Sequence, residues 1–126
     1  MQAGPRQPAR TTVAIAVYWW HDGVTMDLAQ FKQTLDNDAP PESLAPLAMA
    51  LWLAAKCRDG VDDDWHKAHG IAQDTPGTDG SWVHAHLHRI EGDLGNAGYW
   101  YRQAGKPKYK APLAEEWDEI AAALIG

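Results

Sequence analysis

The stretch "SWVHAHLHRIEGDLGNAGYWYRQAG", residues 81–105, decides the fold class of this chain. Apolar residues recur at spacings of three and four on both sides of Gly92 and Asp93, which indicates two amphipathic helices joined by a tight turn. Glycine ends helices readily, and an aspartate can cap the helix that follows. The stretch therefore predicts helices over 81–91 and 94–104, packed antiparallel as a helical hairpin.

The rest of the chain from residue 26 shows the same helical periodicity. The segment 43–58 is apolar almost all round, which is typical of a helix buried between neighbours, and Pro46 fits only in its first turn. We expect Ser81 to cap the helix that follows the turn "TPGTDGS". The sequence thus predicts an all-α fold of antiparallel hairpins with a C-terminal capping helix. The expected helices lie near 26–36, 43–58, 64–73, 81–91, 94–104 and 113–124.

The first 25 residues differ from the rest of the chain. Residues 1–11 are rich in proline and arginine, and "VAIAVYWW" at 13–20 has strand composition without a second strand to pair with. We expect residues 1–25 to be a flexible or loosely docked extension, and Met26 looks like a natural start. Residues 26–126 are then predicted to form a single helical domain.

Composition limits the classes of function. The net charge of −6 argues against nucleic acid as a partner, and the basic run "KPKYK" at 106–110 is better interpreted as a solvated loop. No apolar run approaches the roughly 18 residues of a membrane span. Cys57 is the single cysteine, which excludes a disulfide within the chain and suggests a cytoplasmic protein. We interpret Cys57 as a small buried hydrophobe.

An internal repeat relates two parts of the chain at an offset of 29 residues. Each repeat unit consists of a helix, a turn that contains glycine, and a second helix, and the units span about 44–74 and 81–107. The positions that match are Asp64 with Asp93, Trp65 with Leu94, Ala68 with Ala97, and Ala72 with Tyr101.

The second unit resembles the tetratricopeptide repeat. In "EGDLGNAGYWYRQA", residues 91–104, the turn glycine is followed by an aspartate, a small residue, an aromatic residue and a later alanine at that family's spacing. These residues are Gly92, Asp93, Ala97, Tyr101 and Ala104, and the family's proline comes early, at Pro107. Small residues let two helices cross closely while a ring fills the space beside them. The resemblance implies stacked helical hairpins with a concave face for a protein or peptide partner.

The chain is also similar to a family of small uncharacterised microbial proteins with two linked motifs. The first is Trp-x-x-Ala-His, and the second is His-Ala-x-x-His-Arg-x-Glu-Gly-Asp-x-x-Asn-Ala-x-Tyr-Trp. The matching residues are Trp65, Ala68, His69, His84, Ala85, His88, Arg89, Glu91, Gly92, Asp93, Asn96, Ala97, Tyr99 and Trp100. This resemblance implies no particular activity.

The three histidines of "HAHLH" divide between two faces of the predicted helix. At about 100° per residue, His84, His88 and Glu91 fall within an arc of about 60°, whereas His86 points to the opposite side. His69 lies on the packing face of the preceding helix. A histidine pair at i and i+4 with a carboxylate is a common way to hold zinc or iron on helices, so His69, His84, His88 and Glu91 are candidate metal ligands.

Two other interpretations of these histidines stay open. Imidazoles between helices can be neutral packing residues that take the place of the repeat's usual aromatic side chain. They can also serve as a general acid and base, because imidazole titrates near neutral pH. We expect His66 to be solvated on the outer face of its helix.

The opposite face of the same helix carries the other candidate site. Trp82, His86 and Arg89 are expected on the concave side of the stack, where Arg89 could pair with a carboxylate and Trp82 could form an apolar wall. This predicts a module that binds a protein or peptide, or that associates with itself as a homodimer. The alternative is a small metal-binding protein or enzyme that uses the histidine and glutamate cluster.

Overall fold

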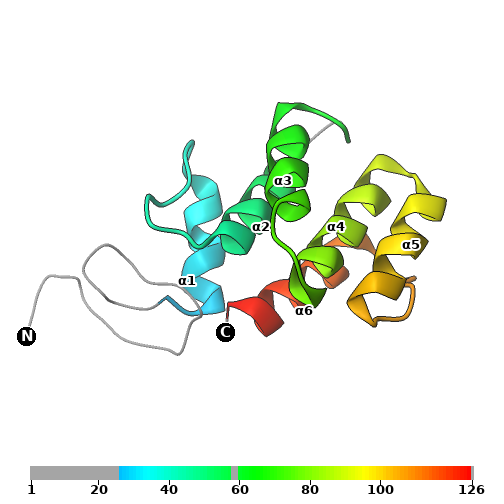
Figure 1. Cartoon of the computed structure of the whole chain (residues 1–126). Helices are drawn as coiled ribbons and strands as arrows, with labels where there is room; N and C mark the ends of the chain where they lie inside the picture. The colour runs from blue at the N-terminus through cyan, green and yellow to red at the C-terminus, as the bar shows by residue number, and fades with distance from the viewer. Residues whose placement is uncertain (1–25, 58–59, 126) are drawn as a thin grey trace, which may run out of the picture.

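The structure is a computed structural model, and it describes residues 26–57 and 60–125. These residues form six α-helices and one 3-10 helix, and no strand occurs among them, which confirms the all-α prediction (Figure 1). The expectations for residues 1–25 fall outside the described residues. The elements are α1 (Leu28–Gln33), η1 (Thr34–Asp36), α2 (Pro46–Lys56), α3 (Asp63–Gln73), α4 (Thr78–Glu91), α5 (Leu94–Ala104) and α6 (Leu113–Leu124).

The helix ends follow the capping residues closely. The Asp62 side chain accepts a hydrogen bond from the backbone N–H of Trp65 at the start of α3, and Asp93 does the same for Asn96 at the start of α5. Gly92 ends α4 in the left-handed conformation, with φ of 85°, which an L side chain rarely adopts. The predicted turn between α4 and α5 is therefore confirmed.

Two helix starts were predicted wrongly: α2 was expected from residue 43 and begins at Pro46, and α4 was expected from residue 81. Ser81 does not cap α4, because the helix begins one turn earlier at Thr78, with Gly77 as the residue before it. Gly77 has φ of 108°, a conformation that lets the chain turn sharply, and Asp79 then places a carboxylate in the first turn, where the helix dipole favours it. The turn "TPGTDGS" is therefore shorter than expected.

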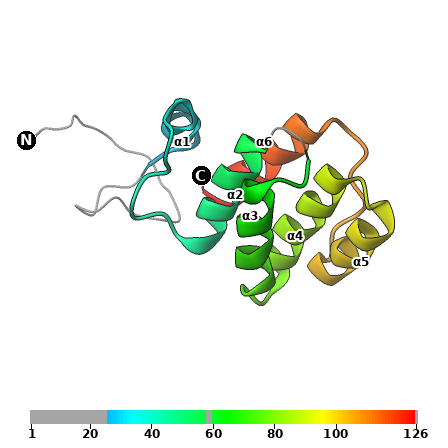
Figure 2. The same ribbon diagram turned by 90° about the horizontal axis from the view of Figure 1, so that it is seen from above.

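The helices pack as hairpins. α2 packs against α3, α4 packs against α5, and the two pairs meet where α3 contacts α4. Both views show α4 and α5 side by side, joined by their short turn (Figures 1 and 2). The predicted pairing of helices is thus confirmed.

Helix α4 is the centre of the fold. Every residue from Trp82 to His88 is buried, because α2, α3, α5 and α6 all pack against this one helix. Such a helix needs partners for polar side chains on all its faces, since a buried polar group without a hydrogen bond is costly.

Helix α6 closes the fold by lying across α2 and α4 (Figures 1 and 2). The indole N–H of Trp117 donates to the backbone oxygen of Leu51 over 2.8 Å, and the Trp117 ring stacks on Phe31 with centroids 6.0 Å apart. The last helix is therefore joined to α1 and α2 by buried contacts, and it covers the side of α4 that carries His86.

Candidate functional site

Three histidines from two helices meet between α3 and α4. His69 comes from α3, and His84 and His88 come from adjacent turns of α4. The Nε2 atoms of His84 and His69 are 3.0 Å apart, and one ring nitrogen from each of the three side chains lies within 4.8 Å of the others. The sequence-based grouping of these histidines is therefore observed.

Two tryptophans hold the histidine rings in place. Trp65 stacks on His69 with centroids 4.7 Å apart and an angle of 10° between the planes, and Trp100 stacks on His84 at 3.9 Å and 13°. The indole N–H of Trp65 also donates to the backbone oxygen of Leu87 over 2.7 Å. The rings are thus oriented by rigid neighbours, as a preorganised site requires.

Glu91 orients the third histidine. Its Oε1 atom lies 2.6 Å from Nδ1 of His88, one turn earlier on α4. An ionised carboxylate only accepts hydrogen bonds, so Nδ1 carries a proton, and Nε2 is the ring nitrogen that remains available to a metal ion. Carboxylates commonly fix metal-binding histidines in this way.

A second acidic group stands near the same end of α4. His88, Glu91 and Asp93 also offer atoms within 4.8 Å of one another, but the two carboxylates are exposed. Asp93 already accepts hydrogen bonds from the backbone and side chain of Asn96. The three-histidine group is therefore the better-formed set of ligands.

The electrostatic environment disfavours the charged form of two of these imidazoles, His69 and His84. Burial, and then the neighbouring His69 and His88, lower the pKa of His84 to about 4. The pKa of His69 is also lowered, mainly by burial and by His88, although Glu91 acts in the opposite direction. His69 and His84 are therefore largely deprotonated at neutral pH, which is the form that binds a metal ion.

On the opposite face of α4, a buried carboxylate from α6 collects three donors. Glu116 is fully buried. Its Oε1 lies 2.8 Å from Nδ1 of His86 and accepts a 2.8 Å hydrogen bond from Arg89. The Tyr101 hydroxyl donates to the other carboxylate oxygen, Oε2. Burial alone would raise the pKa of Glu116, but the hydrogen bonds from His86, Tyr101 and Arg89 lower it overall. Arg89 also donates to the backbone oxygen of Ala111 over 2.8 Å. The carboxylate is thus ionised and fully paired.

This network corrects the expectation of an open concave surface. Trp82 and His86 are 5% and 2% exposed, and Arg89 is held by Glu116. The predicted face of α4 is the right one, yet the chain's own α6 covers it, and the ammonium of Lys106 lies 4.1 Å from the centre of the Trp82 ring. The three side chains therefore contact the protein itself and form no open surface.

Sequence reasoning missed Glu116 because acids in the first turn of a helix are usually solvated. A signal was present, since Glu116 lies three residues after Leu113 and four before Ile120, on the apolar stripe of its own helix. A charge at such a position calls for a buried partner.

Cys57 is only partly buried, where a buried position was expected, and it donates its thiol hydrogen to the backbone oxygen of Leu53 at 3.4 Å. Burial and the nearby Asp62 raise the pKa of Cys57 to about 12, so the thiol is not a nucleophile at neutral pH. His66 is exposed, as expected.

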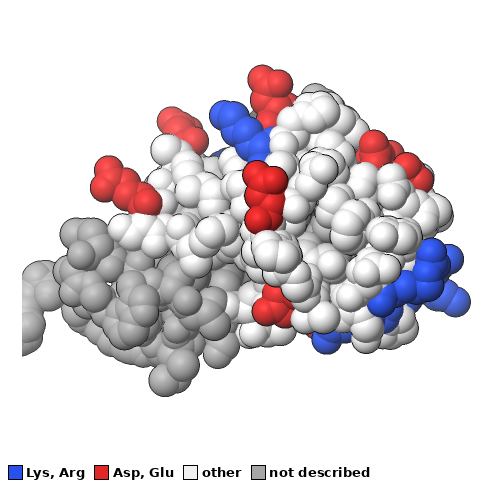
Figure 3. Space-filling model, in the orientation of Figure 1, with Lys and Arg blue, Asp and Glu red and all other residues white. Residues whose placement is uncertain are grey.

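The charges on the molecular surface are unevenly spread. On the face shown in Figure 3, acidic side chains are scattered, and basic side chains lie mainly toward the lower right, although basic atoms also appear near the top beside acidic ones. Within the part of the chain that the structure describes, no helix is both long enough and apolar enough to cross a membrane.

Comparison of the chain with protein families, with curated proteins and with solved structures found no match. The functional argument therefore depends on the geometry of the residues themselves.

Proposed function

We propose that this protein binds a divalent transition metal ion, zinc in the first place, through His69, His84 and His88. The observation that carries the proposal is the convergence of three ring nitrogens within 4.8 Å, with the His88 ring fixed by Glu91. Two zinc–nitrogen bonds of about 2.0–2.1 Å at a tetrahedral angle require nitrogens about 3.3 Å apart. The 3.0 Å between His69 and His84 needs only a small adjustment to reach that separation.

The choice of zinc follows from the ligand atoms. All three proposed ligands are imidazole nitrogens, which suit zinc well, whereas non-haem iron is usually held by two histidines and a carboxylate. Glu91 is engaged with Nδ1 of His88, so it supports a ligand and does not replace one. Three protein ligands leave a fourth position for water, as in catalytic zinc sites.

The competing interpretation is a dry contact in which His69 and His84 share a hydrogen bond. Three close imidazoles are an energetically costly way to fill this contact, because burial removes water from their ring nitrogens and charged rings would repel one another. Phenylalanine would fill the same space without desolvating any nitrogen. The lowered pKa of His84 shows that cost. A bound metal ion would instead coordinate these ring nitrogens and so offset the cost of burying them.

The test is metal stoichiometry and affinity in untagged protein purified without chelators. Elemental analysis should find about one zinc per chain, and calorimetric titration of the metal-free protein should give a single site. Glu91→Gln should weaken zinc binding by about 10- to 100-fold, as expected for loss of a supporting carboxylate. His88→Phe, which keeps a ring in the contact, should weaken it further.

The matched control is His66→Gln, which removes an exposed histidine from the same region. It should leave zinc affinity unchanged. Protein free of bound metal, or equal affinities in His88→Phe and His66→Gln, would contradict the proposal; iron or nickel in place of zinc would correct the ion and keep the site.

A partner-binding role is the second proposal, and it is the weaker one. The hairpin order and the burial of Ala97, Tyr101 and Ala104 support a tetratricopeptide-like stack. In such a stack a peptide or a second copy of the chain would use the concave face, but α6 already covers α2 and α4 there. A partner would first have to displace Glu116 from its donors. The single cysteine supports a reducing compartment such as the cytoplasm.

A further inference from the structure

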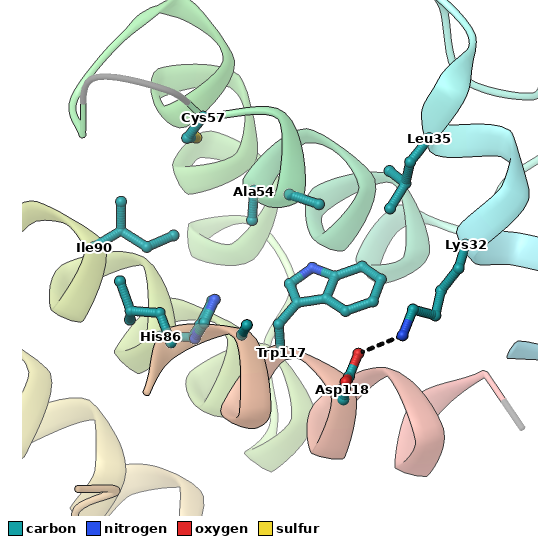
Figure 4. A pocket seen from close by; sticks show the side chains of 11 residues that line it. Lys32, Leu35, Ala54, Cys57, His86, Ile90, Trp117 and Asp118 are labelled. Carbon is teal, nitrogen blue, oxygen red and sulfur yellow. Dashed lines mark hydrogen bonds and ion pairs between the residues drawn. The ribbon is translucent and has the colours of Figure 1, made fainter. Parts of the chain in front are cut away.

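A cavity lies between α1, α2, α4 and α6, on the side of α4 opposite the three-histidine group. Its volume is about 380 Å³, within the range of small-molecule sites in proteins. Its walls are mainly apolar and come from residues such as Leu35, Ala54, Ile90 and Trp117 (Figure 4).

One buried polar side chain reaches this cavity from α4. His86 is 2% exposed and lines the cavity, and Figure 4 shows its ring directed between Ile90 and Trp117. Its Nδ1 atom is paired with Glu116, but no described residue forms a hydrogen bond with its Nε2 atom. Buried polar atoms are rarely left without a partner, so this nitrogen points to a ligand.

The hydrogen bonds around Glu116 define what that nitrogen can do. The carboxylate accepts from Arg89 and Tyr101 as well, so it acts only as an acceptor toward His86. The proton shared with Glu116 is then on Nδ1, and Nε2 remains available for a hydrogen bond to a group that can both donate and accept.

The charges at the rim limit the ligand further. Lys32 and Asp118 are both in the cavity wall, and they form an ion pair with each other at 3.1 Å (Figure 4). The thiol of Cys57 is directed to the backbone oxygen of Leu53. The described lining thus offers no unpaired cation for an anionic ligand.

We propose that this cavity binds an uncharged, mainly apolar molecule that carries one hydroxyl group, which forms a hydrogen bond with Nε2 of His86. The apolar walls supply the affinity, and the single unpaired nitrogen selects for the hydroxyl group. The site is independent of the proposed metal centre, because His86 faces away from His84 and His88 on α4.

The proposal is tested with two matched probes, 2-naphthol and naphthalene, which differ only by a hydroxyl group. Binding is followed by NMR titration, with ¹⁵N shifts of the histidine rings to identify the nitrogen that forms the hydrogen bond. We expect 2-naphthol to bind about fivefold more tightly, the effect of one net hydrogen bond, and to shift the Nε2 resonance of His86. A chelator should leave this binding unchanged.

Two variants examine the cavity itself. Ala114 is an exposed residue of α6 at the cavity wall, so Ala114→Trp should fill the opening and abolish binding of 2-naphthol while leaving the helix content unchanged. Ala122→Trp adds the same ring at an exposed position of α6 outside the wall and should bind normally. Ala55→Trp, from the α2 wall, repeats the test should Ala114→Trp fold poorly.

Three results would overturn the proposal. The first is equal affinity for 2-naphthol and naphthalene, which would remove the role of His86. The second is retained binding in Ala114→Trp or in Ala55→Trp, which would place the probe elsewhere. The third is absence of binding by the wild-type protein up to the solubility limit of 2-naphthol.

Discussion

Replacing Glu116 with glutamine should destabilise the protein strongly, although the two side chains have nearly the same shape. Glu116 is fully buried and accepts hydrogen bonds from Arg89, His86 and Tyr101. The substitution leaves the Arg89 guanidinium, whose side chain is only 14% exposed, without its counter-charge. It also turns an amide N–H₂ group toward groups that are themselves donors.

The magnitude follows from what remains. Breaking a buried ion pair by removing one partner costs about 3–5 kcal/mol. The glutamine oxygen can still accept from Tyr101, and Arg89 keeps its hydrogen bond to Ala111, so the lower end applies. We expect a loss of about 3 kcal/mol, which for a domain of this size lowers the melting temperature by about 10–15 °C.

The assay is urea unfolding followed by tryptophan fluorescence, with Glu115→Gln as the control. Glu115 precedes Glu116 in the same helix but is exposed, so the control makes the same change of net charge and should alter the free energy of unfolding by less than about 0.5 kcal/mol. A loss below about 1 kcal/mol for Glu116→Gln, or equal losses in both variants, would refute the buried network.

Three further predictions concern the α3–α4–α5 region. In metal-free protein, His84 resists protonation down to a pKa of about 4, against about 6.5 when unfolded, because burial and the facing His69 and His88 disfavour its charge. The stability that the neutral His84 ring contributes is therefore complete above pH 6.5 and declines as the pH falls toward 4, by at most about 1.4 kcal/mol per pH unit. Unfolding curves at successive pH values measure this decline. A free energy of unfolding that does not change between pH 6.5 and 4 would contradict the prediction. Ala97→Leu should cost about 1–3 kcal/mol by overpacking a buried contact, and an unchanged urea midpoint would show that the hairpin register is wrong. Trp65→Phe should cost about 1–3 kcal/mol, because it removes the hydrogen bond that the buried indole N–H donates to the Leu87 oxygen of α4. Circular dichroism melting checks this, and an unchanged melting temperature would mean that the hydrogen bond contributes nothing.

Local signals in the sequence were sufficient for the helices. Apolar spacing, together with Asp93 as the expected cap of α5, predicted α3 and α5 almost to the residue, because these signals act within one turn of the helix they define. The start of α4 was missed because Gly77 offers no side chain as a cap, and its effect lies in a backbone conformation that composition does not reveal.

The sequence predicted which face of α4 each histidine occupies, but it did not predict what covers each face. The 100° rotation per residue correctly separated His84 and His88 from His86, and the contact of His69 with them followed from its packing face. What covers the other face depends on where α6 docks. The contact between His86 and Glu116 spans 30 residues and has no local signal in the sequence. An exposed binding surface was therefore expected where a buried ion pair stands.

The zinc coordination shell is the most direct test of the proposed metal centre, and X-ray absorption spectroscopy of the protein loaded with one equivalent of zinc measures it. The geometry of His69, His84 and His88 predicts three imidazole nitrogens at about 2.0–2.1 Å with one further oxygen ligand, and His88→Phe should reduce the imidazole number to two. A shell of oxygen ligands without imidazole scattering, or a sulfur ligand from Cys57, would contradict the account.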